Sequence, residues 1–358
     1  MEEREENQVF TSQLLKWYHS EKRELPWRNT HDAYFIWLSE IILQQTRIQQ
    51  GLPYYQKFIN QYPTVHDLAA ADESEVLRLW QGLGYYSRAR NLHACAKEVA
   101  ETLEGQFPAS YEELLKLKGI GKYTAAAIAS FAFGAAHAVV DGNVFRVLSR
   151  YFGISDDISD AKSFKVFEKK ANQLLPKNDA ANFNQAIMDF GAIQCKPKSP
   201  HCALCPLSSS CFAFNQGLIR ELPVKSKKVK VKKRYFNYLV ISFEEKYLLK
   251  ARGPKDIWQG LYDFALIESI EAQDTELVLN KLKTDRFELL STDGPIKHVL
   301  THQQIFARFI ALKIEDFDTF ERLKEAFGCK AFTAAEIETV PKPILIENYL
   351  KDAVFSVD

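Results

Sequence analysis

Four cysteines, Cys195, Cys202, Cys205 and Cys211, fall within seventeen residues in the spacing C-x6-C-x2-C-x5-C. Thiolates this close in sequence can converge on one metal centre, and soft sulfur ligands select zinc or an iron–sulfur cluster. Structural zinc usually takes two short C-x2-4-C hooks, whereas this run contains only one. The spacing therefore favours an iron–sulfur cluster; a zinc knot and four unligated thiols are the alternatives.

Two carboxylates lie beside apolar residues. Glu40 has Ile36 and Leu43 at i−4 and i+3, so on a helix its carboxyl shares an apolar face. Desolvation on such a face favours the protonated carboxyl, which suits a general acid. Asp141 follows a run of apolar residues and precedes a Gly-Asn pair, where it could simply cap a helix over 144–151. The alternatives to a chemical role are a helix-surface glutamate and a plain N-cap.

A glycine pair marks a tight turn in the run LKGIGKYTAAAIASF, residues 117–131. Gly119 and Gly121 flank one isoleucine, which allows a turn whose backbone comes close to something large. The alanine-rich residues 122–133 that follow favour a helix. A helix N-terminus with free amides and a nearby cation, here Lys122, is a phosphate site. A plain helix–turn–helix corner is the alternative.

These residues need a scaffold, and the sequence predicts two kinds. From about 9 to 215 the apolar residues recur with helical spacing, as Phe10, Leu14 and Tyr18 do. From 235 onward, 235–243 and 246–251 are rich in strand-forming residues, and 276–283 and 344–353 have helical spacing. The predicted organisation is a mainly α region over 1–220, a basic linker over 221–234 and an α+β domain over 235–358.

Composition sets the limits. A chain of 358 residues predicts two domains, and 46 cations against 46 anions leave nucleic-acid binding to local patches. The longest apolar stretch, about 125–140, is too short to span a bilayer. The N-terminus MEEREENQ has no apolar segment of the kind that signals secretion. We therefore expect a cytoplasmic protein with no membrane contact.

Taken together, the glycine hairpin, the segment VDGNVFRVLSR (140–150) and the cysteine spacing resemble the helix-hairpin-helix DNA glycosylases that carry a [4Fe-4S] cluster. Within that superfamily LPWR (25–28), WLSEIILQQT (37–46) and GLGYYSRARNL (82–92) resemble the adenine DNA glycosylases of the MutY type. The similarity runs from about 25 to 211. It implies a monofunctional enzyme that removes adenine mispaired with 8-oxoguanine or guanine in duplex DNA and leaves an abasic site. It also implies that adenine is flipped out of the stack, and we expect a monomer on the DNA.

The resemblance assigns chemical roles. Glu40 is then the acid that protonates adenine and activates water, and Asp141 is the carboxylate that stabilises the oxocarbenium ion. Asn143 orients that carboxyl or the sugar. Tyr123 occupies the position where relatives of the endonuclease III type carry a Schiff-base lysine, and a tyrosine cannot form that imine.

The resemblance also assigns DNA contacts. Gln44, Gln45 and Thr46 are expected to follow Glu40 on the same helix and to probe the flipped base and the space in the stack. An aromatic wedge beside 8-oxoguanine is expected at Tyr85. The remaining expected contacts are the pocket-wall residues Trp27 and Arg28 and the hairpin residues Gly119, Gly121 and Lys122.

The C-terminal part resembles the MutT-like recognition domain of the same family, through the segment WQGLYDF at 258–264. The family reads 8-oxoguanine with a Phe-Ser-His loop, and the nearest match here is Leu300-Thr301-His302. Thr301 keeps the hydroxyl, and His302 could assist by hydrogen bonding. No nudix metal motif is present in the sequence, so pyrophosphate hydrolysis is not expected.

Two other functions compete with adenine excision. One is a different cluster-bearing glycosylase of the same fold, such as a thymine or bifunctional pyrimidine enzyme; Tyr123, the LQQT segment and the extra C-terminal domain speak against it. The other is a noncatalytic DNA-binding protein, which the joint presence of Glu40 and Asp141 disfavours.

Overall fold

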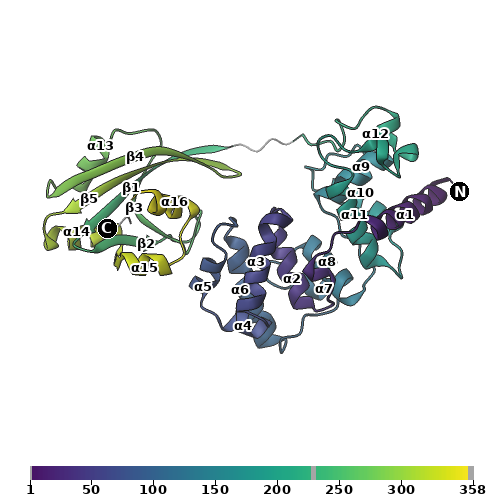
Figure 1. Ribbon diagram of the computed structural model, residues 1–358, viewed down its shortest axis with the longest axis horizontal. Coiled ribbons are helices and arrows are strands. Elements are labelled where there is room, and N and C mark those ends of the chain that lie inside the picture. Colours follow the sequence, from purple (N-terminus) through teal and green to yellow (C-terminus); the bar gives the residue numbers. More distant parts are fainter. Residues whose placement is uncertain (1, 227–230, 354–358) are drawn as a thin grey trace. The chain divides into compact units, whose positions relative to one another are not determined.

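The computed structural model describes residues 2–226 and 231–353, which form two compact units (Figure 1). The first unit combines Met1–Ala69 with Ala94–Lys227, and the second combines Ala70–His93 with Lys228–Asp358. The chain therefore contributes two separate segments to each unit. The mainly α fold followed by an α+β fold is confirmed.

The first unit is helical throughout its described part. Two short 3-10 turns in the cysteine region, η2 (Cys202–Leu204) and η3 (Ser208–Ser210), join longer helices. The other elements are α1 (Glu2–Glu21), η1 (Pro26–Arg28), α2 (Ala33–Leu43), α3 (Ile48–Gln61), α4 (Val65–Ala70), α7 (Tyr111–Leu114), α8 (Lys122–Phe133), α9 (Gly142–Phe152), α10 (Ser163–Leu174), α11 (Ala180–Ile193) and α12 (Phe212–Asn215).

Two apolar clusters hold these helices in place. In the larger one Phe10 and Leu14 of α1 pack with residues of α9, α10 and α11, among them Leu148 and Phe183. The periodic apolar face predicted for the N-terminus is therefore buried. The smaller cluster joins α2 to α8 through Ile36 and the alanine-rich face of α8. Because alanine has no bulk beyond Cβ, it lets α2 and α8 approach closely, which brings Glu40 and Tyr123 together.

The second unit is built on a mixed sheet. In residues 231–353 the strand order is β4-β5-β1-β3-β2-β6, with β1 parallel to β5 and the other neighbours antiparallel. The two predicted strand segments, 235–243 and 246–251, form a hairpin with its turn at 244–245, since Phe243 pairs with Lys246. The strands are β1 (Lys232–Phe243), β2 (Lys246–Ala251), β3 (Tyr262–Ser269), β4 (Phe287–Val299), β5 (Gln303–Ile314) and β6 (Lys330–Thr333).

Helices cover both faces of this sheet (Figure 1). On one face Leu239 and Ile241 of β1 pack against α13 (Thr275–Leu279), η4 (Asn280–Leu282) and α14 (Phe317–Phe327). On the other face Phe309 of β5 stacks on Tyr349 of α16 (Ile344–Ala353) with ring centroids 3.9 Å apart. The central strands β1 and β5 thus contribute to the cores on both faces, as the strand period requires.

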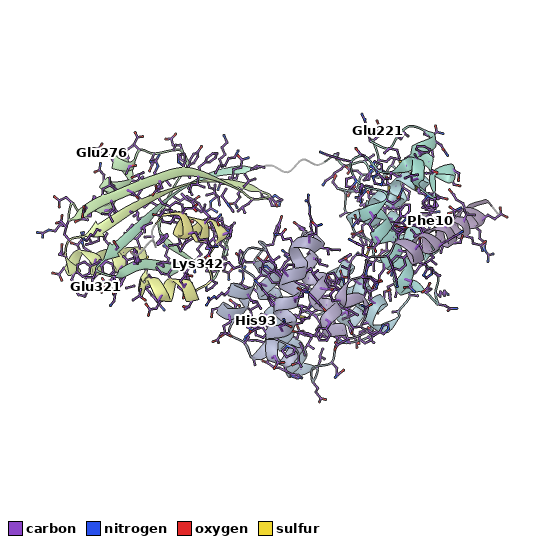
Figure 2. All side chains as sticks on the ribbon, viewed as in Figure 1. Phe10, His93, Glu221, Glu276, Glu321 and Lys342 are labelled. Carbon is purple, nitrogen blue, oxygen red and sulfur yellow. The ribbon has the colours of Figure 1, made fainter. Side chains whose placement is uncertain are left out.

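Residues 70–93 belong to this second unit although they precede most of the first in sequence. They comprise α5 (Glu73–Leu79) and the start of α6 (Ser87–Thr102). Arg90 donates to the carbonyl of Gln259 at 2.8 Å, and Gln81 donates to Glu347 at 3.0 Å. Gln81 also accepts the backbone N–H of Lys342, a buried lysine labelled in Figure 2 that precedes α16 and follows α15 (Ala334–Thr339).

The predicted linker is shorter in the structure. Strand β1 begins at Lys232, so Lys232, Lys233 and Arg234 are strand residues, and Arg234 is buried among carboxylates rather than exposed. Residues 227–230 of the predicted linker lie outside the described residues. Within the described ranges, no helix is both long and apolar enough to cross a membrane.

Candidate active site and cysteine cluster

A cavity of about 360 Å³ lies inside the helical unit and collects most of the residues predicted to do chemistry. Glu40, Tyr123, Asp141 and Asn143 all line it, from α2, α8 and the start of α9. The rest of its wall is Arg23, Leu25, Trp27, Arg28, Ile36, Leu43, Thr46, Arg47, Ile48, Phe131, Gln185, Met188 and Ala192. The two carboxylates therefore share one cavity, although 101 positions separate them in sequence.

Glu40 is 6% exposed and accepts a hydrogen bond of 2.6 Å from the Tyr123 hydroxyl. Burial raises the pKa of Glu40 to about 7, and the nearby Asp141 acts in the same direction. The Tyr123 hydrogen bond and the positive charge of Arg28 oppose that shift. A carboxyl with a pKa near neutrality can give up a proton and take it back, which is the requirement for a general acid and base.

Asp141 both caps a helix and faces the cavity. Its Oδ1 accepts the backbone N–H groups of Asn143 and Val144 at 2.8 Å each, so it is the N-cap of α9. Its Oδ2 accepts from the Asn143 amide at 2.7 Å. Burial raises the pKa of Asp141, and these hydrogen bonds counteract the rise. The two readings of Asp141 are therefore compatible: the cap fixes the carboxyl at the cavity wall.

Asn143 is held from both sides. Its Nδ2 donates to Asp141, and its Oδ1 accepts from Arg146 at 2.8 Å. Arg146 also donates to the carbonyls of Gly191 and Cys195, at 2.6 and 2.7 Å. Arg146 is thus a structural residue that fixes Asn143, and Asn143 in turn fixes Asp141.

The pocket-wall residues stand on a short turn stabilised by an ion pair. Trp27 is 7% exposed and packs edge-on against Tyr55, with ring centroids 5.0 Å apart. Arg28 forms a bidentate pair with Asp189 of α11, at 2.7 and 2.8 Å. Both Trp27 and Arg28 line the cavity, where the resemblance placed them.

The segment Gln44-Gln45-Thr46 does not continue the helix that carries Glu40. Helix α2 ends at Leu43, and Gln45 has φ = 55°, a left-handed conformation that stops the helical hydrogen bonds. Of the three side chains only Thr46 lines the cavity. Gln44 donates to Thr124 at 3.2 Å, and Gln45 is exposed. The expectation that all three share the helix of Glu40 is wrong, because the chain turns between α2 and α3.

The glycine hairpin joins α7 to α8 as predicted. Gly119 has φ = 77°, which a side chain would strain, so glycine is needed there. Gly121 is the N-cap of α8, and a Cβ at this position would meet nothing within 4 Å. Lys122 is exposed at the first turn of α8, with its ammonium 4.9 Å from the centroid of the Phe164 ring. The free helix end and the cation thus lie together at the surface.

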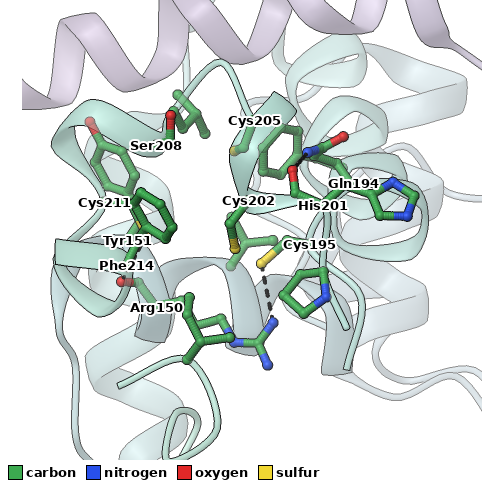
Figure 3. Close-up of a pocket in the computed structure, with 15 residues that line it drawn as sticks. Arg150, Tyr151, Gln194, Cys195, His201, Cys202, Cys205, Ser208, Cys211 and Phe214 are labelled. Carbon is green, nitrogen blue, oxygen red and sulfur yellow. Dashed lines mark hydrogen bonds between the residues drawn. The ribbon is translucent and has the colours of Figure 1, made fainter. Parts of the chain in front are cut away.

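The four clustered cysteines line a small cavity together with Arg150 and Tyr151 of α9 (Figure 3). Arg150 donates to the Cys195 sulfur at 3.5 Å, and its guanidinium also donates to the carbonyls of Lys196 and Pro197. Among the described residues, no three His, Cys, Asp or Glu side chains lie close enough to hold a single metal ion. Four thiols around one space are a donor set that fits a metal ion or an iron–sulfur cluster.

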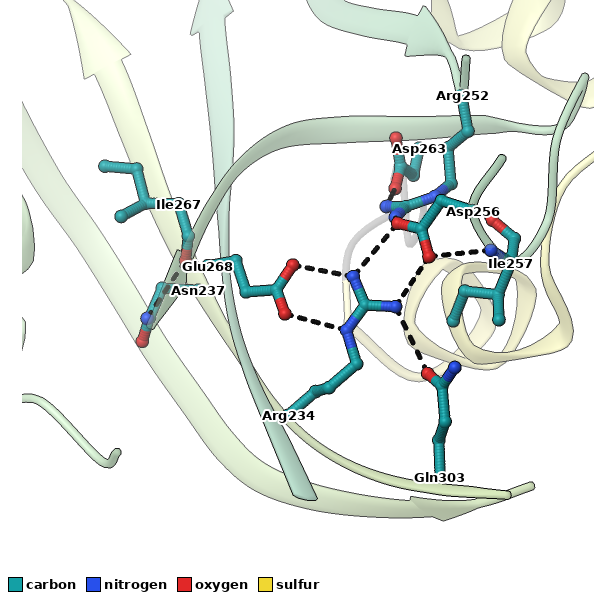
Figure 4. Close-up of polar contacts among 9 residues, drawn as sticks. All are labelled: Arg234, Asn237, Arg252, Asp256, Ile257, Asp263, Ile267, Glu268 and Gln303. Carbon is teal, nitrogen blue, oxygen red and sulfur yellow. Dashed lines mark hydrogen bonds and ion pairs between the residues drawn. The ribbon is translucent and has the colours of Figure 1, made fainter. Parts of the chain in front are cut away.

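A second buried polar cluster lies in the sheet unit (Figure 4). Arg234, which is 8% exposed, pairs with Asp256 and with Glu268, both at 2.6 Å. Arg252 pairs with Asp256 and, at 2.7 Å, with the buried Asp263. We call these five residues the arginine–carboxylate cluster.

The predicted recognition residues lie in the sheet unit. Thr301 and His302 are exposed in the turn between β4 and β5, rather than in a strand. Tyr85, 43% exposed with φ = 47°, shares a hydrogen bond with the Thr301 hydroxyl. Two residues predicted to contact 8-oxoguanine, 216 positions apart, are therefore in direct contact.

Several residues of the active-site cavity were not expected from the sequence. They are Arg23, Arg47, Gln185 and Met188 on the wall, and Asp189 behind it. The run FNQAIMD at 183–189 places Met188 and Asp189 three and four residues after Gln185 in α11. A buried polar group on an otherwise apolar helix is a signal that could have found them. No local pattern links Arg23 to Asp189, which are 166 positions apart.

Two family models match the chain. Residues 38–174 match the HhH-GPD superfamily base excision DNA repair proteins, and residues 237–352 match the NUDIX domain. The matches correspond to the helical part with the two carboxylates and to the sheet with its helices. The expected MutT-like character of the C-terminal part is confirmed.

Solved structures similar to the helical part include a thermostable thymine-DNA glycosylase and a trapped covalent endonuclease III–DNA intermediate. The first has a TM-score of 0.56 and 33% identity, and covers 59% of this chain and 98% of its own. The second has a TM-score of 0.51 and 26% identity, and covers 58% of this chain and 95% of its own. The helical fold is thus shared with a thymine-DNA glycosylase and with endonuclease III.

Similar sequences show which of the enzyme families with this helical fold the chain belongs to. The adenine DNA glycosylase of Buchnera aphidicola subsp. Baizongia pistaciae is 36% identical over 314 residues, which cover 87% of this chain and 88% of the relative. The human adenine DNA glycosylase is 45% identical over 214 residues, which cover 57% of this chain and 39% of the relative. The long match spans both the helical part and the NUDIX part. The chain therefore belongs to the adenine DNA glycosylase family of base excision repair enzymes.

Proposed function

We propose that this enzyme hydrolyses the N-glycosidic bond of adenine mispaired with 8-oxoguanine or guanine in duplex DNA and leaves an abasic site. The observation that carries the proposal is the buried Glu40 carboxyl, with a pKa of about 7, in one cavity with Asp141. Adenine is a poor leaving group, so the bond breaks only if the base is protonated and the sugar cation is stabilised. The cavity contains one group suited to each task.

The proposed reaction has two steps. Glu40 gives its proton to N7 of the flipped adenine, the bond from C1′ to N9 breaks, and its electron pair leaves with the base. The resulting oxocarbenium ion is stabilised by the Asp141 carboxylate, which Asn143 holds in place. The Glu40 carboxylate then takes a proton from water while the water oxygen bonds to C1′. Glu40 thus ends protonated again, and the products are free adenine and an abasic sugar.

Tyr123 supports hydrolysis without strand cleavage. A lyase needs an amine that forms an imine with the sugar, and a phenol cannot do so. Instead, the Tyr123 hydroxyl donates to Glu40 and thereby orients the carboxyl toward the cavity. We therefore propose a monofunctional glycosylase that acts as a monomer on duplex DNA.

The DNA contacts divide between the units. In the helical unit the hairpin at Gly119–Lys122 offers free amides and a cation to a phosphate, and Thr46 and Gln44 lie close to the flipped base. In the sheet unit Tyr85 stacks beside 8-oxoguanine, and Thr301 and His302 supply polar contacts to it. The last assignment rests on the Tyr85–Thr301 contact and on the exposure of all three side chains.

Cys195, Cys202, Cys205 and Cys211 fit a [4Fe-4S] cluster, and we propose that they hold one. Such a cluster supplies a one-electron redox centre and a fixed crosslink for the loop that carries its ligands. The residues of this chain fix the loop as well, since Arg150 donates to Cys195 and to two carbonyls of the loop. A brown protein that absorbs near ~400 nm, with equal iron and sulfide, is the expected result. A colourless protein with one equivalent of zinc would contradict it.

The function is tested with three duplexes that carry A opposite 8-oxoguanine, A opposite G, and T opposite G. Each is incubated with the enzyme under single-turnover conditions and divided into alkali-treated and untreated samples. Cleavage of the adenine strand only after alkali is expected with the first two duplexes. Cleavage without alkali would show a lyase, cleavage of the T strand a thymine enzyme, and no cleavage with retained binding a noncatalytic protein.

A further inference from the structure

A completely buried carboxylate lies behind the wall of the active-site cavity. Asp189 of α11 is 0% exposed, and both of its oxygens are used. Oδ1 accepts from Arg23 Nε at 2.9 Å and from Arg28 Nη2 at 2.8 Å, and Oδ2 accepts from Arg28 Nη1 at 2.7 Å. Oδ2 also accepts the backbone N–H of Arg23 at 3.3 Å. One carboxylate thus binds two guanidinium groups.

Both arginines line the cavity, whereas Asp189 itself does not. Arg28 donates in addition to the carbonyl of Arg23 at 3.0 Å, and its guanidinium lies 5.9 Å from the centroid of the Tyr18 ring. The contacts that orient Arg28 are thus with Asp189, Arg23 and Tyr18, and its hydrogen bonds go to the first two of these residues. The hydrogen bonds of Arg23 likewise hold its guanidinium against Asp189.

The charges that act on Glu40 come from three other elements. Tyr123 of α8 donates a hydrogen bond to it, Asp141 at the start of α9 repels its ionised form, and Arg28 of η1 favours the ionised form. Arg23 and Arg47 complete the charged wall of the cavity. Among these cations, the positive charge of Arg28 favours ionisation of Glu40, and Asp189 is an anion paired with Arg28.

We propose that Asp189 is a positioning residue of the glycosylase reaction, which fixes Arg23 and Arg28 on the cavity wall and balances the charge of Arg28 so that the acid Glu40 keeps its proton. This inference rests on the proposed function, in which Glu40 is the acid. Without Asp189, one unit of positive charge in the low-dielectric wall loses its counterion. The nearest anion available to Arg28 would then be the ionised Glu40 carboxylate, and the acid would lose its proton at lower pH.

The test is the pH dependence of the single-turnover excision rate on A opposite 8-oxoguanine. The descending limb at high pH reports loss of the Glu40 proton. Asp189→Asn is expected to move that limb down by on the order of one pH unit, so that the rate falls about tenfold at pH above the limb and less below it. Arg28→Met is expected to move the limb up, because it removes the charge that favours ionisation of Glu40.

Matched variants separate this effect from a general loss of structure. Asp189→Glu keeps the charge, and its limb should stay at the wild-type pH even if the rate is lower. Asp179→Asn removes an aspartate from the N-terminus of the same helix, outside the cavity, and should leave both rate and limb unchanged. The double variant Asp189→Asn with Arg28→Met should follow Arg28→Met, since the effect of Asp189 acts through Arg28.

Four outcomes decide whether Asp189 acts as proposed. Limbs that shift in opposite directions in Asp189→Asn and Arg28→Met support the proposal. A limb that is unmoved in both overturns it, even if Asp189→Asn is slow at every pH, because a purely structural residue would lower the rate uniformly. If Asp189→Asn does not fold, an unmoved limb in Arg28→Met overturns it alone. If Glu40→Gln retains full activity, the proposed function fails as well. The activity of Glu40→Gln therefore distinguishes failure of the proposed function from failure of the proposal for Asp189 alone.

Discussion

The active-site cavity and the arginine–carboxylate cluster both bury several charged groups, but they satisfy them differently. In the cluster Arg234 and Arg252 together provide direct partners for Asp256, Glu268 and Asp263. In the cavity Glu40 has a hydrogen bond from one neutral phenol and no ion pair among the described residues. Arg28, the cation that could have paired with it, is bound to Asp189 instead.

The pKa values follow from that difference. The Arg234 hydrogen bonds hold the pKa of Asp256 well below its usual range, whereas burial raises the pKa of Glu40 to about 7. Asp263 is the instructive exception in the cluster, because burial raises its pKa to about 6 despite its Arg252 partner. Paired cations thus keep the partly exposed Asp256 ionised, whereas burial without an ion pair lets Glu40 exchange a proton near neutral pH.

Removing one carboxylate from each region tests whether the two regions have different roles. Glu40→Gln should lower the single-turnover excision rate by roughly 10³-fold or more, because the amide cannot donate a proton to adenine or take one from water. Duplex affinity, measured by fluorescence anisotropy, should stay within a few-fold of wild type. Glu268→Gln is the matched control, since it should destabilise the sheet unit without slowing excision of a bound adenine. Equal losses of rate in both variants would show that the cavity is not distinct.

The cluster is expected to matter for stability instead. Arg234→Met leaves Glu268 without its cation and Asp256 with Arg252 alone. It should lower the free energy of unfolding by about 3 kcal/mol, the lower end for a broken buried pair, because both acceptors are 37% exposed. Chemical denaturation followed by tryptophan fluorescence measures this. Glu40→Gln should be neutral or slightly stabilising in the same assay. If Glu40→Gln were destabilised and Arg234→Met were unaffected, the assignment of stability to the arginine–carboxylate cluster rather than to the cavity would be wrong.

The pH dependence of the excision rate tests the protonation states of the two cavity carboxylates. Glu40 must be protonated to act, so the excision rate should decline tenfold per pH unit above about 7, the pKa of the acid. Asp141 must be ionised, and since burial raises its pKa, the rate should also fall on the acid side at a higher pH than an ordinary aspartate would give. A flat rate from pH 6 to 9 in the single-turnover assay would contradict the role of Glu40.

The smallest expected effect concerns recognition. Thr301→Val keeps the shape of the side chain but removes the hydroxyl that contacts Tyr85. The ratio of excision rates for A opposite 8-oxoguanine and A opposite G should fall by about fivefold, the value of one hydrogen bond of about 1 kcal/mol. Thr292→Val in β4, an exposed threonine away from the turn, is the control. An unchanged ratio would remove Thr301 from the recognition role.

Local patterns carried much of the prediction. The apolar neighbours of Glu40 at helical spacing anticipated its burial, the alanine run of α8 gave the helix bounds 122–133, and the strand runs gave β1 and β2 closely. Asp141 was ambiguous in sequence because its neighbouring residues fit a helix N-cap and a catalytic carboxylate equally well. The structure resolves this by making it both a cap and a cavity residue.

The features that the sequence did not predict depend on long-range contacts or on single backbone angles. The turn at Gln45 depends on a left-handed φ that glutamine seldom adopts, so no propensity indicates it. The pairing of Arg23 and Arg28 with Asp189, and that of Tyr85 with Thr301, joins positions more than 150 apart. Likewise, Arg234 reads as one more cation in a basic run, and only the fold gives it carboxylate neighbours.

The grouping of residues 70–93 with the sheet has a practical consequence for dissecting the enzyme. A chain ended at residue 226 would still contain Arg78, Gln81 and Arg90 but would lack Thr339, Glu347 and Gln259, whose oxygens they bond. It would also bare Leu77, which lies against Gly260. Loss of activity after such a deletion would therefore report damage to the remaining helices as much as loss of the proposed contact to 8-oxoguanine. Point substitutions in the β4–β5 turn test that contact without this damage.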